Sequence, residues 1–129
     1  MSVRIVRLGS ARSPGEGLRL GTVRRPPRGV RKVDYALRDY YDVWLPQLAP
    51  APETIKLALG SSSAADWARF VKRYRKEMAT SANQQLLNML AALSLQTNFA
   101  VGCYCEDATR CHRSLLGCLL AERGARIAS

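Results

Sequence analysis

An apolar run, a short polar segment and a second apolar run follow one another near the carboxyl end of the chain. Residues 99–105 form an apolar run typical of a strand buried on both faces, and residues 106–110 have the composition of a loop. Residues 114–123 have the pattern of a helix that ends before Gly124. Such a strand–loop–helix unit places its loop at the carboxyl edge of a parallel sheet. We therefore predict an α/β fold with a short, mainly parallel sheet flanked by helices.

Two further strands are predicted near the amino terminus. Residues 3–8 are rich in β-branched side chains, residues 18–23 alternate between apolar and polar, and the segment 9–17 between them has the composition of a loop. Residues 40–45 fit either a short strand or an aromatic-rich turn. Irregular structure is expected around the next prolines in the chain, which are Pro46, Pro50 and Pro52.

Two helices are predicted in the middle of the chain. Ser63 and Asp66 have the spacing of a capping-box variant at a helix start. Behind them, apolar side chains recur at helical spacing and are expected to be core: Trp67, Phe70, Val71, Tyr74 and Met78. A second helix is expected over about residues 83–95, where leucines share one face.

The length of 129 residues fits a single domain spanning residues 1–129. No apolar run approaches the roughly 20 residues that cross a bilayer, and the first ten residues lack the apolar stretch of a secretory signal. We therefore expect a cytoplasmic protein that makes no use of a membrane. Its four cysteines are expected to be free thiols, with Cys118 as a small core residue.

Positive charge is concentrated in residues 1–32. Nine of the 20 basic residues lie there with a single acid, Glu16, and the whole chain has a net charge of +10. Arginine-rich segments favour anionic partners, because guanidinium groups form bidentate hydrogen bonds with phosphate and carboxylate. Nucleic acid is one such partner, and a solvated basic face that serves solubility is the alternative.

The cysteine-rich stretch carries a resemblance to a known family. Cys-Tyr-Cys-Glu-Asp at residues 103–107 and Cys-His-Arg-Ser at residues 111–114, together with segments 41–50 and 67–77, resemble the bacterial and archaeal family called domain of unknown function 488. The motifs occur in the expected order, and the resemblance covers most of residues 18–123. It implies a small cytosolic α/β domain and names no activity.

A zinc site is one alternative for this stretch. Cys103, Cys105, Cys111 and His112 would complete a Cys₃His shell. Their spacing argues against it, because two residues along a strand are roughly 6.6 Å apart, whereas two thiolates on one zinc lie within about 4 Å of each other. Cys111 and His112, as sequence neighbours, would also need an unusual backbone to converge. A zinc-stabilised structural module is therefore kept as an alternative and is not favoured.

A nucleophilic thiol is the second alternative. Cys105 and Arg110 have a spacing similar to that of the anion-cradling loops of rhodanese-like and phosphatase domains. Glu106 and Asp107, however, place negative charge where such a loop needs none, and they would raise the pKa of the thiol. Cys105 is therefore the weaker of two candidate nucleophiles.

Cys111 is better placed for thiol chemistry. It directly precedes the last helix and lies between Arg110 and Arg113, and both a helix N-terminus and nearby cations lower the pKa of a thiol. His112 has the chemistry of a general base or a proton donor near neutral pH. In the structural alternative, His112 caps the helix and Cys111 fills space.

Parallel strands would bring distant segments to this corner. If the strand at residues 3–8 is parallel to the strand at residues 99–105, residues 9–13 lie beside residues 106–113. We expect an anion-binding pocket that uses these side chains: Arg12, Glu106, Arg110, Cys111, His112 and Arg113, with Tyr41, Asp42 and Trp44 as a wall. Its ligand would be a small molecule that carries a phosphate or a carboxylate. Nucleic-acid association is the alternative function.

Overall fold

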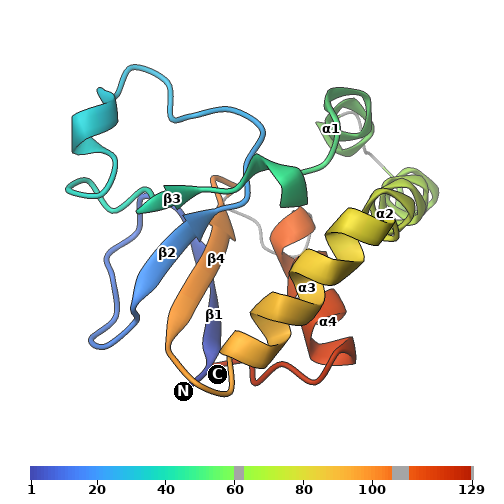
Figure 1. The fold of residues 1–129 in the computed structure, drawn as a ribbon. Helices are drawn as coiled ribbons and strands as arrows, with labels where there is room; N and C mark the ends of the chain where they lie inside the picture. Colours follow the sequence, from blue (N-terminus) through green and yellow to red (C-terminus); the bar gives the residue numbers. More distant parts are fainter. Residues whose placement is uncertain (60–62, 106–110, 129) are drawn as a thin grey trace.

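Four parallel strands form one sheet in the computed structural model, which describes residues 1–59, 63–105 and 111–128. The strand order is β1-β4-β2-β3, with these bounds: β1 Val3–Arg7, β2 Leu18–Gly21, β3 Val43–Trp44 and β4 Phe99–Cys103. The four α-helices lie on one side of the sheet, and the 3₁₀-helix η1 (Lys32–Asp34) lies on the other (Figure 1). The predicted α/β fold is confirmed.

Strand β4 lies between β1 and β2 and is buried along its whole length. Its register pairs Cys103 with Arg7 of β1, and Gly102 with Gly21 of β2. A strand covered on both faces has to be apolar throughout, which explains the uninterrupted apolar run in the sequence. The parallel pairing predicted between the first strand and the strand at residues 99–105 is confirmed.

The helices α2 (Ala64–Met78), α3 (Ser81–Leu93) and α4 (His112–Glu122) correspond to the three predicted ones. Ser63 caps α2 as expected, because its side chain accepts a hydrogen bond from the backbone N–H of Asp66 at 3.2 Å. The last helix begins two residues before the predicted start at residue 114, so that His112 belongs to its first turn.

Helix α1 (Pro52–Leu59) contradicts the prediction of irregular structure after the prolines. Pro52 is the first residue of the helix, a position where the missing N–H needs no partner and where the fixed φ of proline suits a helix. Pro46 similarly begins the short 3₁₀-helix η2 (Pro46–Leu48). The prolines therefore mark helix starts rather than an irregular stretch.

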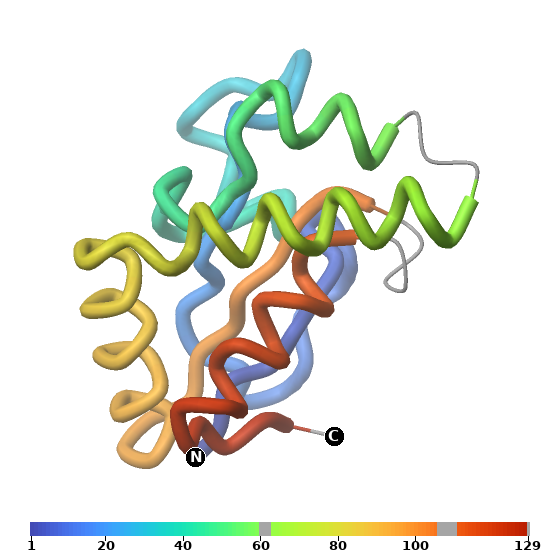
Figure 2. Tube along the Cα trace, turned by 90° about the vertical axis from the view of Figure 1, so that its right-hand side faces the viewer, coloured from blue at the N-terminus to red at the C-terminus, as the bar shows by residue number. Residues whose placement is uncertain are grey.

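The core lies between the sheet and the helices, where α2 crosses the N-terminal end of α4 (Figure 2). Residues of β4, α2 and α4 pack together there, including Val101, Phe70, Tyr74, Leu116 and Leu120. The prediction that Cys118 belongs to the core is wrong, because α4 directs its leucines inward and leaves Cys118 exposed.

Among the described residues, no helix is both long and apolar enough to cross a membrane.

Candidate functional site

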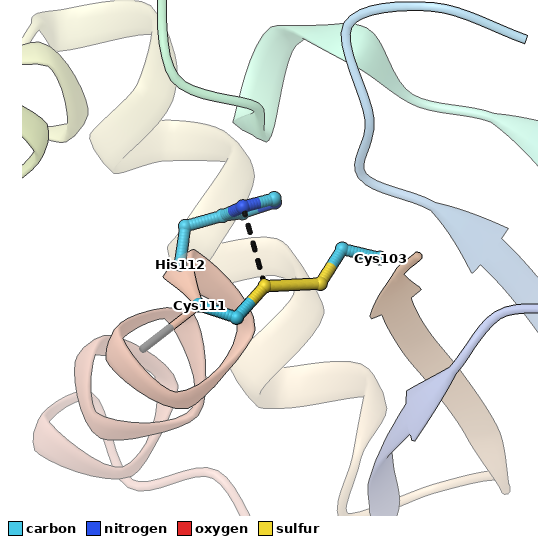
Figure 3. Close-up of side chains that lie close together, drawn as sticks. All are labelled: Cys103, Cys111 and His112. Carbon is cyan, nitrogen blue, oxygen red and sulfur yellow. Dashed lines mark hydrogen bonds between the residues drawn. A yellow bond between two sulfur atoms is a disulfide. The ribbon is translucent and has the colours of Figure 1, made fainter. Parts of the chain in front are cut away.

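Two cysteines meet at the carboxyl edge of the sheet. Cys103 is the last residue of β4, and Cys111 is the residue that precedes the first turn of α4. Their sulfur atoms form a disulfide (Figure 3). The expectation that all four cysteines are free thiols is therefore wrong for this pair. The parallel topology explains the pairing, since the end of one strand and the start of the next helix lie at the same edge.

His112 lies directly beside this pair and is fixed by a hydrogen bond across the edge of the sheet. Its Nε2 is 2.6 Å from the backbone oxygen of Thr22, which comes directly after β2. A carbonyl oxygen only accepts, so Nε2 carries the hydrogen and donates it. In neutral His112 the lone pair is then on Nδ1, and Nδ1 lies 3.8 Å from Sγ of Cys111. The geometry thus directs a basic nitrogen at a cysteine sulfur.

The surroundings of His112 keep its ring uncharged. The side chain is buried, and its ring lies 5.7 Å from the ring of Tyr74 on α2, centroid to centroid. Burial lowers the pKa of His112 to about 4, with a smaller lowering from the charge of Arg113 and an opposing contribution from the Thr22 hydrogen bond. At neutral pH the imidazole is therefore uncharged, and its unprotonated nitrogen is able to coordinate a metal ion.

Arg113 brings a positive charge to the same corner. Its guanidinium is buried, and its Nη1 donates a hydrogen bond of 2.7 Å to the backbone oxygen of Cys105. The same nitrogen lies 3.9 Å from Sγ of Cys103. A cation at this distance favours the thiolate form of a reduced cysteine.

A hollow of about 390 Å³ opens at this corner, and we call it the Cys103 hollow. It is lined by residues from β4, α1, α4 and the segment after β2: Val23, Arg24, Arg25, Pro50, Pro52, Ile55, Lys56, Cys103, Tyr104, Cys105 and His112. Its lining is mostly apolar, and Arg24, Arg25 and Lys56 add three cationic side chains. Cys103 and Cys111 are both almost completely buried, and Cys111 does not line the hollow.

Three candidate metal ligands lie together in this corner. The sulfurs of Cys103 and Cys111 and a ring nitrogen of His112 are within 4.8 Å of one another. The expectation that the neighbours Cys111 and His112 need an unusual backbone to converge is wrong. Cys111 has an extended backbone (φ −129°, ψ 147°) and His112 begins the helix, so the chain turns between them. Cys105 does not belong to this group, in agreement with the argument from strand spacing.

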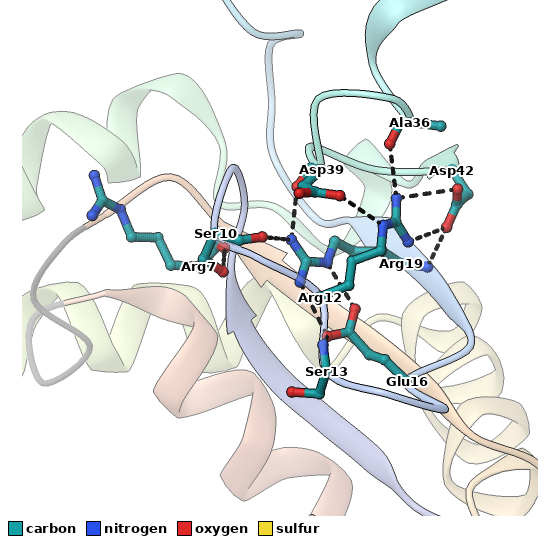
Figure 4. A network of polar contacts seen from close by, with 9 residues as sticks. All are labelled: Arg7, Ser10, Arg12, Ser13, Glu16, Arg19, Ala36, Asp39 and Asp42. Carbon is teal, nitrogen blue, oxygen red and sulfur yellow. Dashed lines mark hydrogen bonds and ion pairs between the residues drawn. The ribbon is translucent and has the colours of Figure 1, made fainter.

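Arg12 is not part of the Cys103 hollow, contrary to the expected pocket. Its Nη1 donates to Asp42 at 2.9 Å, its Nε donates to Asp39 at 3.2 Å, and its Nη2 donates to the backbone oxygen of Ala36 (Figure 4). Two carboxylates on the segment before β3 thus hold Arg12, which does not line the hollow. Arg12 and Asp42 act here as structural partners of each other.

Asp42 and Trp44 lie away from the Cys103 hollow as well. Together with Tyr41 they line a second hollow of about 260 Å³, next to η1. Burial on its own would raise the pKa of Asp42, but hydrogen bonds from Arg12 and from the backbone N–H of Arg19 outweigh it and lower this pKa. The indole N–H of Trp44 donates to the backbone oxygen of Val23 at 2.7 Å. The predicted wall therefore belongs to a different surface.

Glu106 and Arg110, two further predicted ligand residues, lie outside the described residues. Conversely, the sequence did not predict that the backbone oxygen of Thr22 would bind His112, or that Arg24 and Lys56 would line the hollow. The Arg24–Arg25 pair is visible in the sequence as part of the basic segment, but nothing there signals that it lies beside Cys103. Lys56 belongs to the helix that was not predicted.

Several arginines of the basic segment are used by the fold. Arg19 is fully buried and forms two hydrogen bonds with Glu16, at 2.8 and 3.0 Å. Arg24 donates to the backbone oxygens of Ala49 and Pro50. Together with Arg12, these residues reduce the basic surface available to nucleic acid below what the count of arginines suggests.

Comparison with known proteins supports the family assignment and nothing more detailed. No curated protein and no solved structure matches the chain. The family model described as "DUF488-N3a: Active DUF488-N3 subclade" matches residues 3–124, which include β1, the Cys103–Cys111 pair and α4. The chain therefore belongs to the family called domain of unknown function 488.

Proposed function

We propose that the protein binds a small anionic molecule in the Cys103 hollow and exchanges disulfides with it through Cys103 and Cys111. The substrate class is a low-molecular-weight disulfide that carries carboxylate or phosphate groups. One observation carries this proposal: a cysteine pair able to form a disulfide has one member, Cys103, in the lining of a hollow with three cationic side chains.

The two cysteines have different positions, and this difference assigns their roles. Both cysteines are buried, with 1% of Cys103 and 2% of Cys111 exposed, and of the two only Cys103 belongs to the lining of the hollow. Cys111 lies beside Nδ1 of His112 and does not line the hollow. Cys103 is therefore the attacking cysteine, and Cys111 is the cysteine that resolves the mixed disulfide. The sequence alone favours Cys111 as the nucleophile, because it does not reveal which of the two cysteines lines a hollow.

The exchange balances in atoms and electrons. The Cys103 thiolate attacks one sulfur of the substrate disulfide, the substrate S–S bond breaks, and the first product leaves as a thiol. Cys111 then loses its thiol proton to solvent and attacks the Cys103 sulfur as a thiolate, the bond between Cys103 and the substrate sulfur breaks, and the second product leaves as a thiol. Two electrons pass from the cysteine pair to the substrate, and the two thiol protons end on the products. Two molecules of a small thiol of the same class regenerate the pair by the reverse reaction and leave as one small disulfide.

The charges around the hollow supply selectivity for an anionic substrate. Arg25 and Lys56 are exposed at the hollow, and Arg24 is held there by its hydrogen bonds to two backbone oxygens. Nη1 of Arg113 lies 3.9 Å from Sγ of Cys103, where it stabilises the attacking thiolate. The cations along the hollow attract an anionic ligand, and the cation beside Cys103 stabilises the thiolate that reacts with it.

The test measures how fast the reduced protein is oxidised by each of two small disulfides of opposite charge, glutathione disulfide and cystamine. Cys105→Ser/Cys118→Ser protein serves as the background, because it leaves only the Cys103–Cys111 pair as thiols. We expect glutathione disulfide to oxidise the pair faster than cystamine at low salt, with the difference decreasing as salt is added. Equal rates for the two disulfides, or no oxidation by either, would contradict the proposal.

A further inference from the structure

We infer that the reduced side chains of Cys103, Cys111 and His112 form a binding site for one soft divalent metal ion, with zinc as the best match. The three donors are two sulfurs and one imidazole nitrogen, all buried and all within 4.8 Å of one another. Zinc binds cysteine sulfur at about 2.3 Å and histidine nitrogen at about 2.0–2.1 Å. Two cysteines and one histidine are a ligand set that zinc uses in catalytic sites.

The hydrogen bond of His112 is of the kind that orients a metal ligand. Histidine ligands usually donate their second ring N–H to a carboxylate or a backbone oxygen, which fixes the ring and its tautomer. In this protein Nε2 donates to the backbone oxygen of Thr22 at 2.6 Å, and Nδ1 faces the sulfurs. The nitrogen that would bind the metal is therefore already oriented by the end of β2.

The backbone spacing of the two cysteines also suits a bridging ion. Their sulfurs are joined in the oxidised state across a Cα–Cα distance of 7.7 Å, and after reduction the same backbone separation leaves room for an ion between them. Two thiolates on one zinc lie within about 4 Å of each other and leave the backbones further apart than a direct S–S bond does. The end of β4 and the start of α4 are therefore separated by a distance that suits an ion held between the two sulfurs.

A fourth coordination position would face the Cys103 hollow. Cys103 and His112 both line that hollow, and Cys105 is not part of the donor group. Three protein ligands with an open position are the arrangement of zinc sites that take a water molecule or an anionic ligand. The cations Arg25 and Lys56 lie along the same hollow and favour an anion there.

Metal binding and disulfide formation use the same two sulfurs and therefore exclude each other. Binding of one zinc ion to the reduced pair releases the two thiol protons, and oxidation of the pair by a small disulfide removes both thiolate donors. The inference does not require the proposed exchange reaction. A protein that binds zinc but does not react with glutathione disulfide would keep the metal site and lose the proposed function.

The test is a titration of the full-length chain with Co²⁺ and with Zn²⁺, in the reduced state and after oxidation of the Cys103–Cys111 pair. We expect one Co²⁺ per reduced chain, with thiolate-to-metal charge-transfer absorption and the intense visible bands of tetrahedral cobalt, and displacement of Co²⁺ by Zn²⁺. Oxidised protein should bind neither ion, and renewed reduction should restore binding.

Variants identify the ligands. Cys103→Ser, Cys111→Ser and His112→Phe should each lose one-to-one binding, whereas Cys118→Ser, an exposed cysteine on α4, should bind like the wild type. Circular dichroism shows which variants are folded, and the two redox states of the wild-type chain provide a test that needs no substitution. The inference is overturned if folded, reduced wild-type protein binds no Co²⁺, or if folded Cys103→Ser protein shows the same spectrum as the wild type.

Discussion

Nε2 of His112 donates a hydrogen bond of 2.6 Å to the backbone oxygen of Thr22, a residue 90 positions earlier in the chain. This contact joins the first turn of α4 to the segment after β2 and fixes which ring nitrogen faces Cys111. One hydrogen bond therefore contributes both to the stability of the corner and to the chemistry available to the sulfur.

The two functions of His112 are separable by substitution. Glutamine places an amide N–H near the position of Nε2, and asparagine places a polar atom near the position of Nδ1. We expect His112→Asn to be less stable than His112→Gln by about 1–3 kcal/mol, because it leaves the buried Thr22 oxygen without its donor. Urea denaturation measures this difference. Equal stability of the two variants would contradict the role assigned to the hydrogen bond.

Arg19 and Glu16 form a buried ion pair whose loss should be costly. Both side chains are almost completely buried, and the pair is joined by two hydrogen bonds. Removing one partner leaves a buried charge without compensation, so Arg19→Met should lower the free energy of unfolding by about 3–5 kcal/mol.

The double variant Arg19→Met/Glu16→Leu is the matched control for this pair, with stability again measured by denaturation. It should recover only part of the loss, since Arg19 also donates to the backbone oxygens of Ser10 and Asp39. A single variant as stable as the wild type would show that the pair does not contribute.

The carboxylates Glu16 and Asp42 should make the fold sensitive to acid. Burial on its own would raise the pKa of each, but hydrogen bonds and the charges of Arg19 and Arg12 outweigh burial and lower both values. A carboxylate whose pKa is lowered by folding adds stability above its unfolded pKa, near 4, and this stability is lost as the pH falls toward the folded value.

We therefore expect urea denaturation to give a lower free energy of unfolding at about pH 3 than at about pH 5. In Arg12→Gln the contribution from Asp42 should shrink, because the guanidinium that lowers its pKa is gone. A wild-type stability that is the same at both pH values would contradict this assignment.

Positive charge at the Cys103 hollow should control the rate at which anionic disulfides oxidise the Cys103–Cys111 pair. Arg25→Gln and Lys56→Gln should each slow oxidation by glutathione disulfide by roughly threefold to fivefold at low salt, about 0.7–1 kcal/mol for a partly exposed charge. Lys72→Gln changes an exposed lysine on α2 outside the hollow and is the control. Stopped-flow measurements over a range of salt concentrations check this. An equal effect at Lys72 would indicate a dependence on net charge alone.

Much of the fold can be predicted from patterns that act over short distances in the sequence. The apolar run at β4, the capping residue Ser63 and the leucines of α3 each specify an element with little help from the rest of the chain. Helix α1 was missed because a proline that interrupts a strand can equally begin a helix, and the residues on its carboxyl side decide between the two.

The candidate site depends on contacts that the sequence does not encode locally. The Cys–His–Arg motif correctly placed the candidate site at the junction of β4 and α4. The expected partner Arg12, however, is held by Asp39 and Asp42. Thr22 contributes through a backbone oxygen, and a backbone atom leaves no mark in residue type. Arg24 and Lys56 line the same hollow as Cys103 although they lie far from it in the sequence.

The most direct test of the account is a trapping experiment with glutathione disulfide in the Cys105→Ser/Cys118→Ser background. With Cys111→Ser added, the resolving sulfur is absent, and intact-mass analysis should show one glutathione bound per chain, located at Cys103 by peptide mapping. With Cys103→Ser added instead, Cys111, which does not line the hollow, should remain unmodified in the folded protein. Modification of Cys111 in place of Cys103, or no adduct with either variant, would contradict the assignment of Cys103 as the sulfur that meets the ligand.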